Sequence, residues 1–95
     1  MDHPARRTRR QKIFQPFILV GPRGERRAHL LDISENGALI HCDPSCDKGA
    51  LVQIKLPDRS LGAKVAWSAS PHFGVIFAQP LSANALSALL QAKAL

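Results

Sequence analysis

The residues of this 95-residue chain that are best suited to bind a ligand fall into two groups. The first is rich in arginine and places Arg6 and Arg10 four positions apart near the N-terminus. A guanidinium offers planar, paired donors that fit a phosphate or the O6/N7 edge of guanine, and its flat face also stacks on a base. Arg7 and Arg9 lie between these two residues and are candidates for additional contacts.

The second group is the segment Asp32-Ile33-Ser34-Glu35-Asn36-Gly37. Asp32 accepts hydrogen bonds, which suits the N1–H and 2-amino donors of guanine, and Ser34 can donate to a phosphate oxygen. Gly37 permits a sharp backbone turn or the close approach of a ligand. Together the two groups describe a receptor for an anionic guanine nucleotide.

Each group also has a simpler interpretation. Asp-x-Ser-x-x-Gly is an ordinary strand–turn–strand signal, in which Asp and Ser satisfy backbone donors and Gly adopts a positive φ. An arginine-rich N-terminus is by itself a solvated tail or a nonspecific contact to polyanions. The combination of the two groups, in this order, favours the receptor.

No catalytic set assembles from the remaining residues. An enzyme needs groups placed to move protons, to attack a substrate or to hold a metal. His3 lies near the N-terminus, while His29, His41 and His72 fall in or at the start of expected strands, so we interpret all four as structural or solvent-facing. Gly21-Pro22-Arg23-Gly24 lacks the length and the Lys-Ser/Thr ending of a phosphate-binding loop. We therefore predict a protein that is not an enzyme.

The two cysteines, Cys42 and Cys46, lie close to His41, Asp43 and Asp47, which together could supply zinc ligands. A structural zinc site uses paired close spacings and four ligands, however, and this chain has one cluster only. We interpret Cys42 as a small buried residue and Cys46 as a loop thiol, and we predict no metal and no cofactor. Without a signal peptide or a long apolar segment, we expect a cytoplasmic protein with reduced thiols and no membrane insertion.

Length and charge limit the organisation of the chain. A chain this short fits one domain, and its 45% hydrophobic content is enough for a small core. Thirteen Lys and Arg against seven Asp and Glu give a net charge of +6, which favours anionic partners. The charge is dense in residues 1–12, which we predict to form a flexible basic arm, with residues 13–95 forming a single domain.

Short β-prone runs broken by Gly, Pro, Asp and Ser predict an antiparallel sheet or barrel. The six expected strands are residues 13–20, 26–33, 37–42, 51–56, 61–68 and 73–78. Alternation is clearest at Val52, Ile54 and Leu56. By the same rule Val65 and Trp67 share a face, which favours a core position for Trp67 over the alternative, a place in a ligand-facing wall.

The period changes after Pro80, where Ser82 or Asn84 can cap a helix. The leucines at helical spacing in this segment are Leu86, Leu89 and Leu90. Six strands in so short a chain leave exposed edges unless the sheet closes. The predicted fold is therefore all-β, a six-stranded antiparallel barrel with a C-terminal α-helix across one opening.

These features resemble the PilZ domain family, whose members are bacterial receptors for cyclic di-GMP. Arg6-Arg7-Thr8-Arg9-Arg10 is similar to the RxxxR motif of that family, and Asp32-Ile33-Ser34-Glu35-Asn36-Gly37 to its D/N-x-S-x-x-G motif. The similarity continues through Gly49, Val65-Ala66-Trp67, Gly74-Val75-Ile76-Phe77 and the leucine-rich C-terminus. It implies a PilZ-like barrel that binds cyclic di-GMP.

The resemblance also implies a role for each motif residue. Arg6 and Arg10 would wrap the ligand and contact guanine and phosphate. Asp32 would bind a guanine edge, Ser34 would reach phosphate or base, and Gly37 would keep the turn open. An arm that closes on the ligand gives two states, which would signal to a downstream protein partner. The resemblance leaves open whether one or two ligands bind.

The alternative is a small basic β-barrel that binds RNA or DNA through its arm and sheet. Its aromatic content counts against this alternative, because most aromatic residues fall at inward strand positions and leave little surface for stacking. The aromatic residues are Phe14, Phe17, Phe73, Phe77 and Trp67. An adaptor that binds only protein is a further alternative. We therefore expect no specific nucleic-acid partner.

Overall fold

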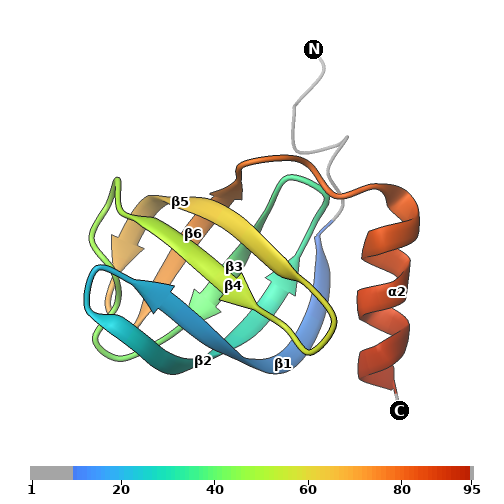
Figure 1. Ribbon diagram of the computed structural model, residues 1–95, viewed down its shortest axis with the longest axis horizontal. Coiled ribbons are helices and arrows are strands. Elements are labelled where there is room, and N and C mark those ends of the chain that lie inside the picture. The colour runs from blue at the N-terminus through green and yellow to red at the C-terminus, as the bar shows by residue number, and fades with distance from the viewer. Residues whose placement is uncertain (1–9, 95) are drawn as a thin grey trace.

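A computed structural model describes residues 10–94 of the chain and the side chains of residues 10–91. Arg6, Arg7 and Arg9 lie outside the described residues, as does most of the expected arm. The chain forms six strands and a helix (Figure 1). They are β1 (Gln11–Gly21), β2 (Gly24–Ile33), β3 (Gly37–His41), β4 (Leu51–Lys55), β5 (Ser60–Ala69), β6 (His72–Phe77) and α2 (Ala83–Ala94). All six expected strands are present, with ends that differ from the prediction by no more than two residues.

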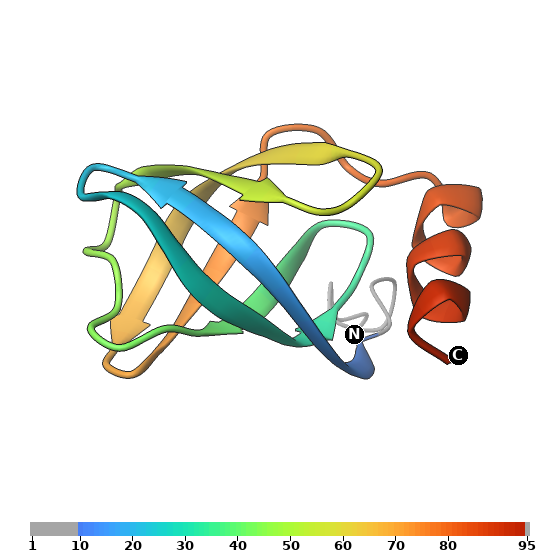
Figure 2. The ribbon, with the colours of Figure 1, turned by 60° about the horizontal axis from the view of Figure 1, so that its bottom comes forward.

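The strands close into an antiparallel barrel in the order β1-β2-β3-β6-β5-β4 (Figures 1 and 2). Closure occurs where β1 pairs with β4, from Ile18↔Lys55 to Val20↔Gln53. The predicted all-β barrel is therefore confirmed. Strand β1 begins at Gln11, so that Lys12, which we assigned to the arm, pairs with Asp32 of β2.

Inward side chains of all six strands fill the barrel. The most completely buried are Leu19, Leu30, Ile33, Ile40, Ile54, Val65 and Phe73. Full burial of such a side chain stabilises the fold by about 1.5–3 kcal/mol. The alternation predicted for β4 is confirmed, because Val52 and Ile54 are buried and Gln53 is exposed.

The predicted position of Trp67 is wrong. Val65 pairs with Val75 and points inward, whereas Trp67 pairs with Gly74, so that two residues of β5 lie opposite one residue of β6. This β-bulge adds Ala66 to the strand and reverses the side of the sheet on which the next side chain lies. Trp67 is consequently on the outer surface, with 42% of its area exposed.

The C-terminal helix lies beside the end of the barrel where β1 begins and the β2–β3 turn lies (Figures 1 and 2). Of the two predicted caps, Ser82 and Asn84, it is Ser82 that caps the helix, because its Oγ accepts a hydrogen bond of 3.0 Å from the backbone N–H of Ala85. Leu89 is buried, and Leu86 and Leu90 pack against the core while partly exposed. The helix thus lies at one end of the barrel, where it was expected (Figures 1 and 2).

Candidate functional site

A row of four residues crosses the outer face of β2, β3, β6 and β5. The strand registers align Asp32 with Leu39, Leu39 with Gly74, and Gly74 with Trp67. Asp32 reaches this face through a bulge in β2, because Leu30 pairs with Ile40 and Asp32 with the adjacent Leu39. Strict alternation from the buried Leu30 would have turned Asp32 into the core. We call this set, Asp32, Leu39, Gly74 and Trp67, the outer row.

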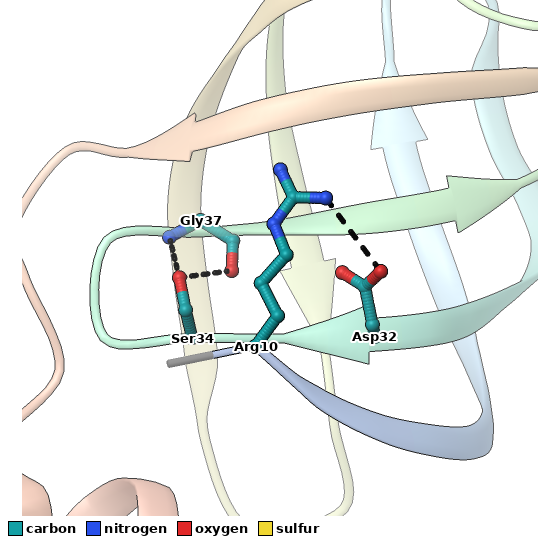
Figure 3. Close-up of polar contacts among 4 residues, drawn as sticks. All are labelled: Arg10, Asp32, Ser34 and Gly37. Carbon is teal, nitrogen blue, oxygen red and sulfur yellow. Dashed lines mark hydrogen bonds and ion pairs between the residues drawn. The ribbon is translucent and has the colours of Figure 1, made fainter. Parts of the chain in front are cut away.

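Arg10 lies over one end of the outer row, directly before β1. Its Nη1 atom is 3.7 Å from Asp32 Oδ2, and 65% of the Arg10 side chain is exposed (Figure 3). At that distance the two groups form an ion pair but not a close hydrogen bond. Because the Arg10 side of the pair is exposed and the contact is long, the pair contributes little stability, and the guanidinium can turn to a ligand at small cost.

The other oxygen of Asp32 is the least satisfied acceptor of the site. The Asp32 side chain is only 15% exposed. Its Oδ1 atom is buried and has no hydrogen-bond partner within residues 10–94. A buried acceptor without a donor costs about 1–3 kcal/mol or more when it is charged. A ligand that brings an N–H donor to this oxygen would remove that cost.

Ser34 holds the β2–β3 turn rather than facing solvent, since it is only 6% exposed. Its Oγ accepts a 3.3 Å hydrogen bond from the backbone N–H of Gly37 and donates to the Gly37 carbonyl oxygen at 3.3 Å (Figure 3). The same Oγ also accepts a 3.3 Å hydrogen bond from the backbone N–H of Asn36. This is the simpler, turn-forming interpretation of the motif. The expected contact of Ser34 with a phosphate or base stays a prediction.

Gly37 is required by the neighbouring strand. A Cβ atom at this position would overlap the backbone carbonyl oxygen of Val75 in β6. Gly37 does not have a positive φ, so the positive-φ explanation of this glycine is wrong. The turn is also fastened at its other residues, because Asn36 accepts a 2.8 Å hydrogen bond from Phe77 and Glu35 a 2.7 Å hydrogen bond from Leu81. The motif therefore sets the approach of β6 to β3.

Trp67 provides a plane at the far end of the outer row. A Cβ atom at Gly74 would overlap the ring of Trp67, so the indole lies directly over this glycine. The absence of a side chain at Gly74 leaves the space that the ring occupies. Indole is a good stacking partner for a nucleobase. Alternation along the sequence assigned Trp67 to the core. The information needed to place it correctly was the register of β5 against β6, which the residue type does not carry.

The site thus combines complementary groups on one surface. Arg10 supplies planar cationic donors, Asp32 an anionic acceptor, and Trp67 an aromatic plane, with the small Gly74 and the apolar Leu39 between them. Of the predicted site residues, the structure brings Arg10, Asp32, Ser34 and Gly37 to one end of the β2–β3 hairpin (Figure 3). Such a surface can bind a ligand that carries both purine edges and phosphates.

A groove of about 940 Å³ lies beside the site, over the outer faces of β4, β5 and β6. Exposed Leu51 and Ile76 contribute to its lining together with Lys64. None of the motif residues Arg10, Asp32, Ser34 and Gly37 lines it. The hydrogen-bonding groups of the two motifs therefore lie next to this groove and not inside it.

The cysteines lie away from the site. Cys42 and Cys46 are both free and buried, which agrees with the interpretation of Cys42 and shows that Cys46 is less exposed than a loop thiol. Burial raises the pKa of the Cys42 thiol above its ordinary value, and the nearby Arg26 partly opposes this rise. Across residues 10–94, no three His, Cys, Asp or Glu side chains are placed to share a metal ion.

Comparison with known protein families matches residues 4–93 to the PilZ domain. The match spans nearly the whole chain and includes both arginines of the RxxxR motif. A search of curated proteins finds no match. No helix within the described part of the chain is long and apolar enough to cross a membrane.

Proposed function

The chain belongs to the PilZ domain family, and from this premise we propose that it is a noncatalytic receptor for cyclic di-GMP. PilZ domains are known as receptors for this dinucleotide and are generally binding domains without catalytic activity. The ligand is a cyclic dinucleotide with two guanines and two phosphodiesters. Its recognition needs acceptors for the guanine Watson–Crick edge and cations for the phosphates.

The observation that carries the proposal is the Asp32 carboxylate. One of its oxygens forms a loose ion pair with Arg10, and the other is buried without a donor among the residues that the structure describes. The N1–H and 2-amino groups of guanine are adjacent donors that match the two oxygens of a carboxylate. Guanine binding would give Asp32 Oδ1 its missing hydrogen bond and would release Arg10 for a phosphate or a base face.

The other residues support this arrangement in different ways. Arg6, outside the described residues, supplies the second guanidinium in the proposal, and Arg7 and Arg9 add attraction for the anion. Ser34 and Gly37 keep the β2–β3 turn in place. Trp67 offers the second guanine a surface at the other end of the outer row.

We further propose that binding signals to a protein partner through the region around the β2–β3 turn. Glu35 of this turn holds Leu81 by a 2.7 Å hydrogen bond, and Leu81 directly precedes Ser82, the cap of α2. Leu81 and Ser82 thus connect the β2–β3 turn of the site to the start of α2. Displacement of Arg10 at the N-terminal end of β1 would change the same end of the barrel, where the helix packs.

Calorimetric titration with cyclic di-GMP tests the proposal, with GTP and linear pGpG as control ligands. We expect micromolar or tighter binding to the wild-type chain, at least tenfold weaker binding to Arg10→Ala, and little response to GTP. Arg23→Ala is the matched control, because Arg23 is an exposed arginine in the β1–β2 turn at the opposite end of the barrel. Equal losses for both variants, or no binding at tens of micromolar ligand, would reject the receptor.

A further inference from the structure

Three histidines line up on the outer face of the barrel, and neither motif includes them. His29 of β2 pairs with His41 of β3, and His41 pairs with His72 of β6. Their ring centroids are 6.4 Å apart for His29 and His41 and 5.3 Å apart for His41 and His72. The ring of Phe14 stacks on His29 at 4.7 Å and ends the line. We call His29, His41 and His72 the histidine row.

The histidine row runs directly beside the outer row. On β3, Leu39 and His41 are separated only by the buried Ile40, and on β6, Gly74 and His72 only by the buried Phe73. Two residues along a strand correspond to about 7 Å. No other outward-facing side chain of β3 or β6 lies between the two rows, so a ligand spread over Leu39 and Gly74 has the imidazoles at its edge.

The charged groups around the histidine row are few. Arg27 and Asp32 belong to β2, and Lys12 of β1 pairs with Asp32. Lys55 of β4 lines a pocket together with Arg27 and His29, and Asp43 follows β3. The facing part of β5, at Ala69, contributes no charge. The nearby carboxylates are Asp32, whose Oδ2 atom faces Arg10, and Asp43, which lies two residues after His41.

The three imidazoles lie close enough together to present donors to one anionic ligand. An oxyanion beside the histidine row attracts the protonated form of each ring. Phosphodiesters remain anionic throughout the range in which imidazole changes its charge.

We propose that the histidine row is a second, phosphate-contacting wall of the ligand site, and that it makes the affinity for an anionic dinucleotide rise as the pH falls. The inference rests on the proposed function and adds residues and a regulatory variable to it. The sign follows from linkage: if the ligand binds the protonated row better, the complex holds more protons than the free protein, and lowering the pH favours the complex.

Titration with cyclic di-GMP at about pH 6, 7 and 8, at constant ionic strength, tests the inference. The wild-type chain should bind about fivefold tighter at pH 6 than at pH 8. At pH 7, its binding heat should differ between buffers of different ionisation enthalpy, which reports uptake of protons. The variant with His29→Gln, His41→Gln and His72→Gln together should lose both effects. Lys48→Gln changes an exposed lysine of the loop before β4, outside both rows, and should keep them.

The outcomes separate this inference from the proposed function. Wild-type binding that is lost in Arg10→Ala but does not change with pH supports the receptor and rejects the role of the histidines. The same pH dependence in the triple variant also rejects it. Absence of binding at every pH rejects both. If the triple variant does not fold by circular dichroism, His41→Gln alone decides, because removal of the central ring should at least halve the pH effect.

Discussion

Asp32 and Trp67 lie in the same outer row of the barrel, each turned to the surface by a β-bulge in its own strand. Three interstrand spacings separate them, a span of about 14 Å. One residue is an anionic acceptor and the other an aromatic plane, and only Leu39 and Gly74 lie between them in the row. The span suits the two ends of a dinucleotide, one guanine at the carboxylate and one at the indole.

Replacement of Asp32 by Asn should weaken binding of cyclic di-GMP by about 10- to 100-fold, because the anionic acceptor for the guanine donors is lost. The free protein should not become less stable, since Asp32 Oδ1 has no partner to lose in the described part of the chain. Calorimetry and thermal melting of the same samples check both statements. Weak binding together with a large fall in Tm would instead assign Asp32 a structural role.

Trp67 should report ligand binding directly, because it is the single tryptophan of the chain and is exposed. Stacking of a base on its ring should change the intensity and wavelength of its emission. Gly74→Ala should displace the indole, whose ring occupies the space of the new Cβ, and should weaken binding. A ligand-saturated emission spectrum identical to that of the free protein would place the ligand elsewhere.

Gly37→Ala should destabilise the fold by about 1–3 kcal/mol, because its Cβ would overlap a backbone carbonyl of β6 that cannot move alone. Gly62→Ala is the matched control. There the new Cβ would be 3.3 Å from the flexible end of Gln53 and 3.7 Å from Ala78, so little must shift. Chemical denaturation compares the free energies of unfolding, and equal values for the two variants would contradict the assignment of Gly37.

The stability of the barrel should decline in alkaline solution through Cys42. Burial raises the pKa of this thiol, so above the thiol pKa of the unfolded chain, about 8.5, the folded state holds more protons than the unfolded state. The stability that the protonated Cys42 thiol contributes is fully present below the pKa of the unfolded chain. It is lost as the pH rises through the higher pKa of the folded state. Thermal melts from about pH 7 to 10 under reducing conditions measure the decline.

Cys42→Ala should flatten that alkaline decline, whereas Cys46→Ala keeps the Cys42 thiol and should retain it. Both side chains are buried, so the two variants remove comparable apolar groups. A decline of the same steepness in all three proteins would assign it to other groups.

Much of the architecture was predictable because its causes are local. Turn residues separate the strands, apolar alternation marks their inward faces, and Ser82 followed by helical leucine spacing starts α2. Arg10, Asp32, Ser34 and Gly37 were selected by residue type and motif spacing. Each of these signals acts over a few neighbouring residues, and the sequence by itself determined them.

Tertiary structure alone decided which side of the sheet several of these residues occupy. The bulges at Leu31 and Ala66 depend on the pairing of β2 with β3 and of β5 with β6. Alternation along one segment does not reveal a bulge, and for this reason it placed Trp67 in the core. The reason for Gly37 is the distance to Val75. The histidine row exists only because β3 pairs with β6, a strand far along the chain. Register between distant strands is set by the packing of the whole barrel, and no local pattern encodes it.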